Sequence, residues 1–148
     1  MADRLNELSE VSVKEAEEGD VLEKGHVYVA PGGMHMEVVK AHGNTHRIKL
    51  DDLPPIGGLR PCANIMFDSL AKTDYDEIIC IVLTGMGADG TNGILSLNRT
   101  KPIHVIAQDA QTCVVYGMPR AIAEAGMVDE VVPLTAVAKT IIKNVGVK

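Results

Sequence analysis

Aromatic residues and cysteines are scarce in this 148-residue sequence, which has no tryptophan, one phenylalanine and three cysteines. The cysteines lie far apart and form no C-x-x-C pair, which argues against a disulfide framework and a cysteine-based zinc site. No apolar run approaches the roughly 20 residues of a membrane span, and residues 1–5 lack the apolar core of a signal peptide. We therefore expect no membrane insertion and predict a cytoplasmic location.

Positive charge is also scarce. The 14 lysines and arginines and 20 aspartates and glutamates give a net charge of -6, and no basic cluster is available to bind nucleic-acid phosphates. Nucleic acid is therefore not an expected partner. His42 and His46 could face each other across a Gly43-Asn44 turn, but the spacing offers no further metal ligands. We expect neither a metal nor any other cofactor.

The hydrophobic pattern indicates one globular domain of the α/β class. With 46% hydrophobic residues, the chain can bury most of the surface that it exposes when unfolded. A charged lead-in, reaching to about residue 20, precedes the first expected strand. The expected strands are residues 27–30, 36–40, 46–50, 78–82, 103–107 and 128–132, and the expected helices are residues 62–70, 91–97, 119–125 and 135–143.

This order of elements predicts the topology. The strands at 36–40 and 46–50 flank a Gly-Asn turn and should form an antiparallel hairpin. The later alternation of helices and strands is typical of a parallel sheet. We therefore predict a doubly wound, mostly parallel sheet with helices on both faces and one antiparallel hairpin, in a single domain spanning residues 1–148.

The most informative segment is the turn at residues 83–90, Leu-Thr-Gly-Met-Gly-Ala-Asp-Gly, which separates the expected strand 78–82 from the expected helix 91–97. In open parallel sheets, ligands and catalytic groups collect beyond the carboxyl ends of the strands. The carboxylate of Asp89 is therefore predicted to lie at such a crevice.

Three interpretations of this turn are open. Asp89 could cap the following helix while the glycines adopt positive φ angles. Gly85, Gly87 and Gly90 also match the G-x-G-x-x-G spacing of dinucleotide sites. In that case Asp109 would bind the ribose, but Asp89 would repel the pyrophosphate. In the third interpretation, Asp89 is the acid of a hydrolytic triad and orients a histidine.

Three segments resemble the chemotaxis protein-glutamate methylesterase family, CheB. They are residues 29–36 (VAPGGMHM), residues 83–90 (LTGMGADG), and residues 107–109 (AQD) with 115–121 (VYGMPRA). Their order and separations also match, so the resemblance covers nearly the whole chain. It implies a doubly wound α/β serine hydrolase that removes methyl groups from glutamyl methyl esters on methyl-accepting chemoreceptors. Some members of the family also deamidate receptor glutamines.

The resemblance assigns roles to individual residues. Asp89 corresponds to the triad acid of the family, and Met86 corresponds to a position that lines the active site, between Gly85 and Gly87. From the sequence alone, Met86 could instead pack beneath the loop. The family further implies two partners, the chemoreceptors and a receiver domain that precedes the esterase domain.

The nucleophile and the base of the family are not found in these 148 residues. The family serine lies in a Gly-x-Ser-Thr-Gly-Gly segment and the family histidine precedes Met-Pro, and neither segment occurs here. The four serines lack the Gly-rich strand-to-helix turn that exposes a nucleophile; they are Ser9, Ser12, Ser69 and Ser96.

We therefore expect this chain to be the carboxyl-terminal part of an esterase domain, without the amino-terminal strands and helices. Such a chain carries only the acid and should be inactive by itself. It should also self-associate or bind a compensating partner through the apolar surface left uncovered. The alternatives are a catalytically inactive module that binds receptors or a regulator, and a nucleotide-binding α/β domain that uses the turn from Gly85 to Gly90.

Overall fold

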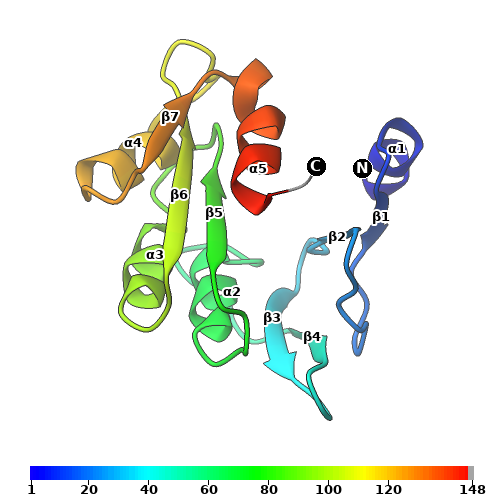
Figure 1. Cartoon of the computed structure of the whole chain (residues 1–148). Helices are drawn as coiled ribbons and strands as arrows, with labels where there is room; N and C mark the ends of the chain where they lie inside the picture. Colours follow the sequence, from blue (N-terminus) through cyan, green and yellow to red (C-terminus); the bar gives the residue numbers. More distant parts are fainter. Residues whose placement is uncertain (147–148) are drawn as a thin grey trace. The chain divides into compact units, whose positions relative to one another are not determined.

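The computed structural model describes residues 1–146 and has the predicted α/β architecture (Figure 1). The chain divides into two compact units, Met1–Asp74 (unit 1) and Tyr75–Lys148 (unit 2). The strands are mostly parallel, with one antiparallel pair, which confirms the predicted fold class. The assignment of residues 1–148 to a single, partial domain stays a prediction. No helix in the described part of the chain is long and apolar enough to cross a membrane.

Unit 1 consists of helices and two strand pairs. Its elements are α1 (Ala2–Leu8), β1 (Ser12–Glu15), β2 (His26–Val29), β3 (His35–Lys40), β4 (His46–Asp51) and α2 (Ala63–Leu70). Strands β1 and β2 are parallel, and β3 and β4 form the predicted antiparallel hairpin. Gly43, in the hairpin turn, has a φ of 66°, a left-handed conformation that glycine adopts without steric cost.

Two predictions for the amino-terminal segment are wrong. The segment expected to be a charged lead-in contains helix α1 and strand β1. The strand predicted to be the first, at residues 27–30, corresponds to β2 and is therefore the second strand of the chain. Helix α1 shows no apolar stripe, because Ala2 is buried but both of its leucines are exposed. A tertiary contact holds it instead, since Asn6 Oδ1 accepts a hydrogen bond from Val13 N–H at 2.8 Å. Hydrophobic periodicity cannot reveal a helix that is fixed in this way.

Two buried histidines fix the loops of unit 1. The ring of His35 is 1% exposed; its Nδ1 accepts a hydrogen bond from Cys62 N–H at 3.3 Å, and its Nε2–H donates to the Pro54 carbonyl at 3.0 Å. The Nε2 of His46 accepts a hydrogen bond from Asp74 N–H at 3.1 Å. Because buried polar atoms must be hydrogen-bonded, each ring connects its strand to a distant segment of the chain.

The hairpin packs on α2 around a core formed by Ala16, Val38 and Ile48. The hydroxyl of Ser69 in α2 accepts a hydrogen bond from Val38 N–H at 2.9 Å and donates to the Met66 carbonyl at 2.6 Å. Ser69 therefore has a structural role between helix and strand.

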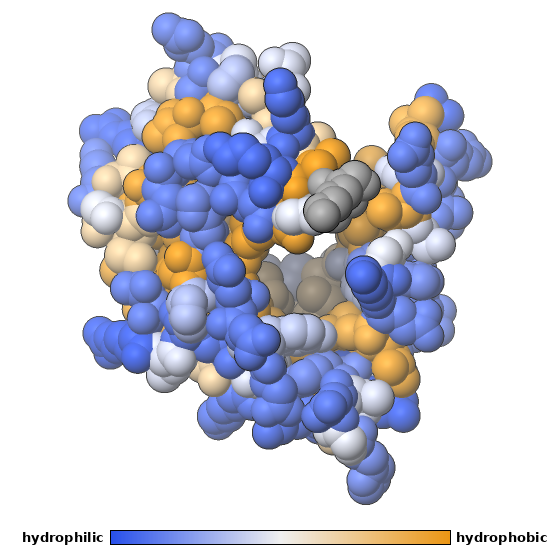
Figure 2. Space-filling view, in the orientation of Figure 1, coloured by the Kyte–Doolittle hydropathy of each residue, from blue (hydrophilic) through white to orange (hydrophobic). Residues whose placement is uncertain are grey.

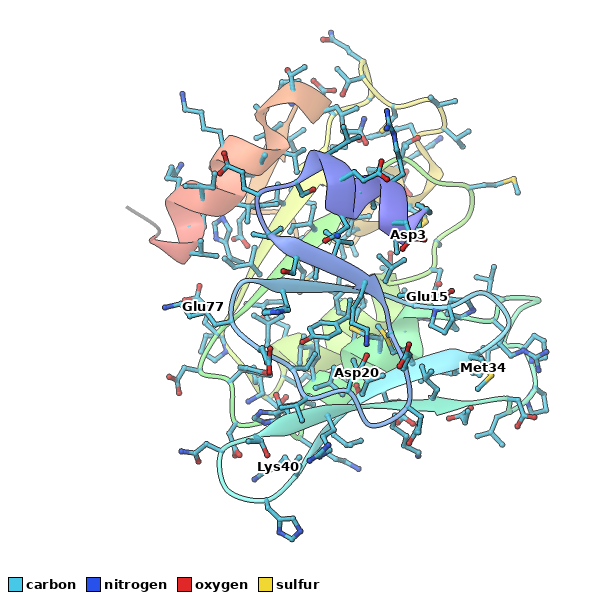
Figure 3. The ribbon with its side chains drawn as sticks, turned by 90° about the vertical axis from the view of Figure 1, so that its right-hand side faces the viewer. Asp3, Glu15, Asp20, Met34, Lys40 and Glu77 are labelled. Atoms are coloured by element: carbon cyan, nitrogen blue, oxygen red, sulfur yellow. The ribbon has the colours of Figure 1, made fainter. Side chains whose placement is uncertain are left out.

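An ion pair links β1 to the turn that follows it. Asp20, labelled in Figure 3, contacts the ammonium of Lys14 at 2.9 Å and accepts a hydrogen bond from Glu17 N–H at 2.9 Å. These two bonds, first that of Lys14 and then that of Glu17, hold the pKa of Asp20 below its ordinary value. The turn before residue 20 is therefore stabilised by charge as well as by backbone conformation.

Unit 2 is built on a three-stranded parallel sheet in the order β5-β6-β7. Its elements are β5 (Ile78–Val82), α3 (Thr91–Asn98), β6 (Ile103–Gln108), α4 (Gly117–Glu124), β7 (Glu130–Val132), the 3₁₀ helix η1 (Leu134–Ala136) and α5 (Val137–Val145). In Figure 1, α3 and α4 flank one face of this sheet and α5 the other. Helices on both faces are the arrangement that parallel strands require to bury their apolar side chains.

The boundaries of two helices differ from prediction. Helix α4 begins at Gly117 rather than Pro119, because a proline is tolerated within the first turn, where its missing N–H has no helical partner. The helix expected over residues 135–143 is divided into η1 and α5. Strand β7 is shorter than the expected 128–132. Asp129, just before it, still contacts β6, because its N–H donates to the Val105 carbonyl at 2.9 Å and its side chain accepts from Val105 N–H at 2.7 Å.

A polar cluster attaches α5 to the sheet. The carboxylate of Glu130 contacts His104 Nε2 at 2.7 Å, Asn144 Nδ2 at 2.9 Å and Lys143 Nζ at 3.1 Å. These contacts, that of His104 foremost, lower the pKa of Glu130 from 4.5 to about 2.

This pKa predicts an acid-sensitive step in stability. A carboxyl whose pKa is depressed by folding stabilises the native state above its unfolded pKa, and the effect is lost as pH falls towards the folded pKa. The free energy of unfolding should therefore decrease between pH 4.5 and about 2. Urea denaturation across this range should show a smaller decrease for Glu130→Gln, whereas Glu77→Gln, outside the cluster, should behave as the unmodified chain. Equal slopes in all three proteins would contradict the assignment.

Candidate functional site

The predicted turn at residues 83–90 lies where β5 ends, at the carboxyl edge of the sheet of unit 2. Strand register pairs Val82 with Ala107 and Ala107 with Val131, so the segments that leave β5, β6 and β7 start side by side. This is the edge at which open parallel sheets place their ligands and catalytic groups. All of the predicted site residues therefore belong to this edge of one unit.

Gln108, the last residue of β6, holds the three segments together. Its side chain is fully buried; Oε1 accepts a hydrogen bond from Thr84 N–H at 2.8 Å, and Nε2 donates to the Thr112 carbonyl at 2.8 Å. The hydroxyl of Thr112 donates to Asp109 Oδ1 at 2.6 Å and accepts from Leu134 N–H at 3.0 Å. One connected set of hydrogen bonds thus links the segments that follow β5, β6 and β7.

A second set of contacts joins the turn to the start of α4. Thr84 Oγ1 donates to the Val115 carbonyl at 3.0 Å and accepts from Val115 N–H at 2.9 Å. Gly85 N–H donates to the same carbonyl at 3.0 Å, and the Gly85 carbonyl accepts from Met118 N–H at 2.9 Å. The backbone at Gly85 is therefore paired with that at Tyr116 as in a short parallel strand, and these bonds hold the start of the turn in place.

Two glycines at this junction lie in close contact with neighbouring atoms, Gly117 with backbone and Gly85 with a side chain. A Cβ on Gly117 would lie 2.8 Å from the Gly85 carbonyl oxygen and 2.9 Å from Gly87 N, distances shorter than real contacts allow. A Cβ on Gly85 would meet the Met118 sulfur at 2.5 Å. Packing against α4 thus gives a reason for Gly85 that does not involve a bound pyrophosphate.

The remaining predicted residues lie as follows. Gly90, with a φ of 96°, occupies the N-cap position of α3, and Asp89 precedes it in a half-buried position. Met86 is 87% exposed, so the interpretation that it packs beneath the loop is wrong. Asp109, the alternative ribose-binding acid, accepts hydrogen bonds from the N–H and hydroxyl of Thr112 and so belongs to its own loop.

Exposed apolar residues accompany Asp89 along this edge. Figure 2 shows apolar surface interspersed with hydrophilic surface on the molecule. The large apolar residues exposed on the segments that follow the three strands are Leu83 (38%), Met86 (87%), Val114 (91%), Val115 (44%) and Leu134 (51%). We call this set the apolar rim.

The sequence of unit 2 offers no triad partner for Asp89. Its one histidine, His104, pairs with Ile79 towards the opposite end of the sheet and binds Glu130. Its one serine, Ser96, lies inside α3 and not in a strand-to-helix turn. The site in this unit therefore consists of an acid on a rigid turn.

Sequence reasoning missed the residues that build the turn, chiefly Gln108, Thr112 and Gly117. One signal was available, since Gln108 is a polar residue at the end of an otherwise apolar strand. A buried polar group needs hydrogen-bond partners, and such a residue therefore indicates a polar network. Its partners could not be identified from sequence, because Thr84 is 24 positions away.

The fold and the turn define an α/β protein in which an acid stands at the carboxyl edge of a parallel sheet. Comparison with known proteins specifies the family. Residues 1–141 match the family model described as CheB methylesterase. The chain belongs to this family, which confirms the resemblance seen in its sequence.

Individual relatives agree. The chain is 42% identical, over 99% of its length, to a protein-glutamate methylesterase/protein-glutamine glutaminase of Geobacillus kaustophilus, and 49% identical over 97% to one of Clostridium acetobutylicum. It covers 42% and 40% of those two proteins, so it spans less than half of their length. The crystal structure of the Thermotoga maritima CheB methylesterase catalytic domain matches with a TM-score of 0.89 and 38% identity, over 96% of this chain and 74% of that domain.

The close approach at Gly117 predicts a specific sensitivity to added volume. Gly117→Ala should lower the free energy of unfolding by about 1–3 kcal/mol, because its Cβ meets backbone atoms that cannot rotate away. Gly32→Ala is the matched control, since a Cβ there meets nothing within 4 Å. Urea denaturation should separate the two variants, and equal stability of both would refute the packing argument.

The hydrogen bonds of Gln108 predict a second effect. Gln108→Ala leaves Thr84 N–H without its buried acceptor, so the free energy of unfolding should fall by about 1–3 kcal/mol. Amide exchange at Thr84 should accelerate at the same time. Gln111→Ala, at an exposed position of the same loop, should change neither quantity. If exchange of the Thr84 N–H were unchanged in Gln108→Ala, the side-chain amide of Gln108 would not be what holds the turn.

Proposed function

We propose that this chain supplies the acid of a Ser-His-Asp triad, Asp89, for hydrolysis of glutamyl methyl esters on methyl-accepting chemoreceptors. The observation that carries the proposal is the rigid glycine turn at the carboxyl edge of the sheet, with Asp89 at its end, in a chain of the CheB methylesterase family. Gly85, Met86 and Gly87 of the same turn line the active site. Deamidation of receptor glutamines is a second reaction of the same site.

The triad acid works only through a histidine. In ester hydrolysis the serine attacks the carbonyl, the histidine takes the serine proton, and the acid orients the histidine and stabilises the imidazolium. A Gly-x-Ser-Thr-Gly-Gly segment and a histidine before Met-Pro are absent from these 148 residues. In this proposal both groups come from polypeptide outside this sequence, and the chain by itself is inactive.

The partners follow from the same assignment. The similar proteins of Geobacillus kaustophilus and Clostridium acetobutylicum are named as acting on protein glutamate and glutamine, so their substrates are proteins. The apolar rim beside Asp89, above all Met86 and Val114, offers a surface for such a substrate. We assign the receptors as substrates, a receiver domain as the controlling partner and the cytoplasm as the compartment.

A hybrid enzyme tests the role of Asp89. In the Thermotoga maritima catalytic domain, the segment that matches this chain is replaced by the chain itself, and methanol release from methylated receptor is measured. The hybrid should be active, and the chain alone should release no methanol above background. Asp89→Asn in the hybrid should lower kcat by roughly 10⁴-fold, because the histidine then loses the acid that sets its tautomer.

The control is Asp76→Asn, an exposed carboxylate that precedes β5 and lies outside the turn. It should leave kcat of the hybrid unchanged. Full activity of the Asp89→Asn hybrid would reject the triad assignment, and methanol release by the chain alone would reject its dependence on other polypeptide.

A further inference from the structure

The side-chain amide of Gln108 is held in one orientation inside unit 2. Gln108 is 0% exposed and ends β6. Its Oε1 accepts a hydrogen bond from Thr84 N–H at 2.8 Å, and its Nε2 donates to the carbonyl of Thr112 at 2.8 Å and to the hydroxyl of Thr112 at 3.2 Å. Turning the amide by half a rotation would set donor against donor at Thr84 and acceptor against acceptor at the Thr112 carbonyl. Thr112 therefore aims the amide oxygen of Gln108 at the turn that follows β5.

The turn that carries Asp89 is attached at both of its ends. Its far end is held by α3, because Gly90 is the N-cap of that helix and the Gly90 carbonyl accepts a hydrogen bond from Ile94 N–H at 2.9 Å. Its near end is held at the Thr84 N–H, which Gln108 binds. Asp89 stands between these two attachments. Loss of the bond to Gln108 would release the near end while the far end stays in place, and the carboxylate of Asp89 would shift relative to the sheet.

We propose that Gln108 is a positioning residue for ester hydrolysis, which sets the rate of turnover by placing the carboxylate of Asp89. This inference rests on the proposed role of Asp89 as the triad acid. The rate depends steeply on such placement, since a displacement of about 1 Å by a substitution away from the reacting atoms can lower it roughly 100-fold. Because Gln108 is fully buried, it does not touch a substrate. Its substitution should therefore lower kcat and leave KM unchanged.

Gln108→Glu tests this role with a side chain of the same shape. A carboxylate still accepts a hydrogen bond from Thr84 N–H, but it cannot donate one, and it is repelled by the Thr112 carbonyl. In the hybrid catalytic domain, kcat for methanol release should fall roughly 10-fold to 100-fold, with KM unchanged. Gln111→Glu makes the same chemical change at an exposed position of the same loop and should alter neither constant. Each variant is assayed where it is fully folded, so that loss of folded protein does not contribute to kcat.

A second pair of variants decides the question if Gln108→Glu does not fold. Thr112 is exposed, and its hydroxyl accepts hydrogen bonds from Gln108 Nε2 at 3.2 Å and from Leu134 N–H at 3.0 Å. Thr112→Val removes this hydroxyl with little change of shape. It should lower kcat by a smaller factor than Gln108→Glu, because the Thr112 carbonyl still binds the amide. Thr112→Ser keeps the hydroxyl and should restore the kcat that Thr112→Val loses.

Combination with Asp89→Asn separates positioning from a general loosening of the fold. If Gln108 acts through Asp89, Gln108→Glu lowers kcat in the unmodified hybrid and causes no further loss in the Asp89→Asn hybrid. Equal losses in both backgrounds would overturn the inference. So would an unchanged kcat in Gln108→Glu or, where that protein does not fold, in Thr112→Val, while Asp89→Asn has lost activity. Full activity of Asp89→Asn would instead reject the triad assignment, and the role of Gln108 would be rejected with it.

Discussion

The buried side-chain amide of Gln108 is the interaction on which the rest of the candidate site depends. No water reaches it, so its bonds to Thr84 and Thr112 cannot be replaced if either partner moves. Through Thr84 it fixes the turn after β5, and through Thr112 it fixes the loop after β6. The hydroxyl of Thr112 extends the same network to Leu134 after β7. One side chain thus sets the positions of the three segments at the carboxyl edge.

Rigidity of this edge is what the proposed chemistry requires. A triad acid contributes by holding an imidazole in one orientation, and it can do so only if its own backbone is fixed. The backbone contact between Gly85 and Gly117 and the paired hydrogen bonds between Thr84 and Val115 provide this fixation. The turn then presents Asp89 in a half-buried position and Met86 in an exposed one. Structure and family membership together support an acid-bearing part of an esterase.

The sequence allowed prediction of the elements that depend on local pattern. Strand β5 coincides with the predicted residues 78–82, because an apolar run between polar and glycine-rich segments is a local signal. The turn at 83–90 followed from its glycines. Helix α1 was missed, since a contact from Asn6 to Val13 holds it rather than an apolar stripe. The Gln108 network was missed for a related reason, because its members are brought together only by folding.

The most direct measurement is an NMR titration of the base histidine in the hybrid catalytic domain, with Asp89 and with Asn at that position. If Asp89 orients and stabilises the imidazolium, its carboxylate raises the pKa of that histidine, and Asp89→Asn lowers it. The downward shift should be accompanied by loss of the low-field Nδ1 proton signal. Superimposable titration curves for the two proteins would show that Asp89 does not contact the base and is not the acid of the triad.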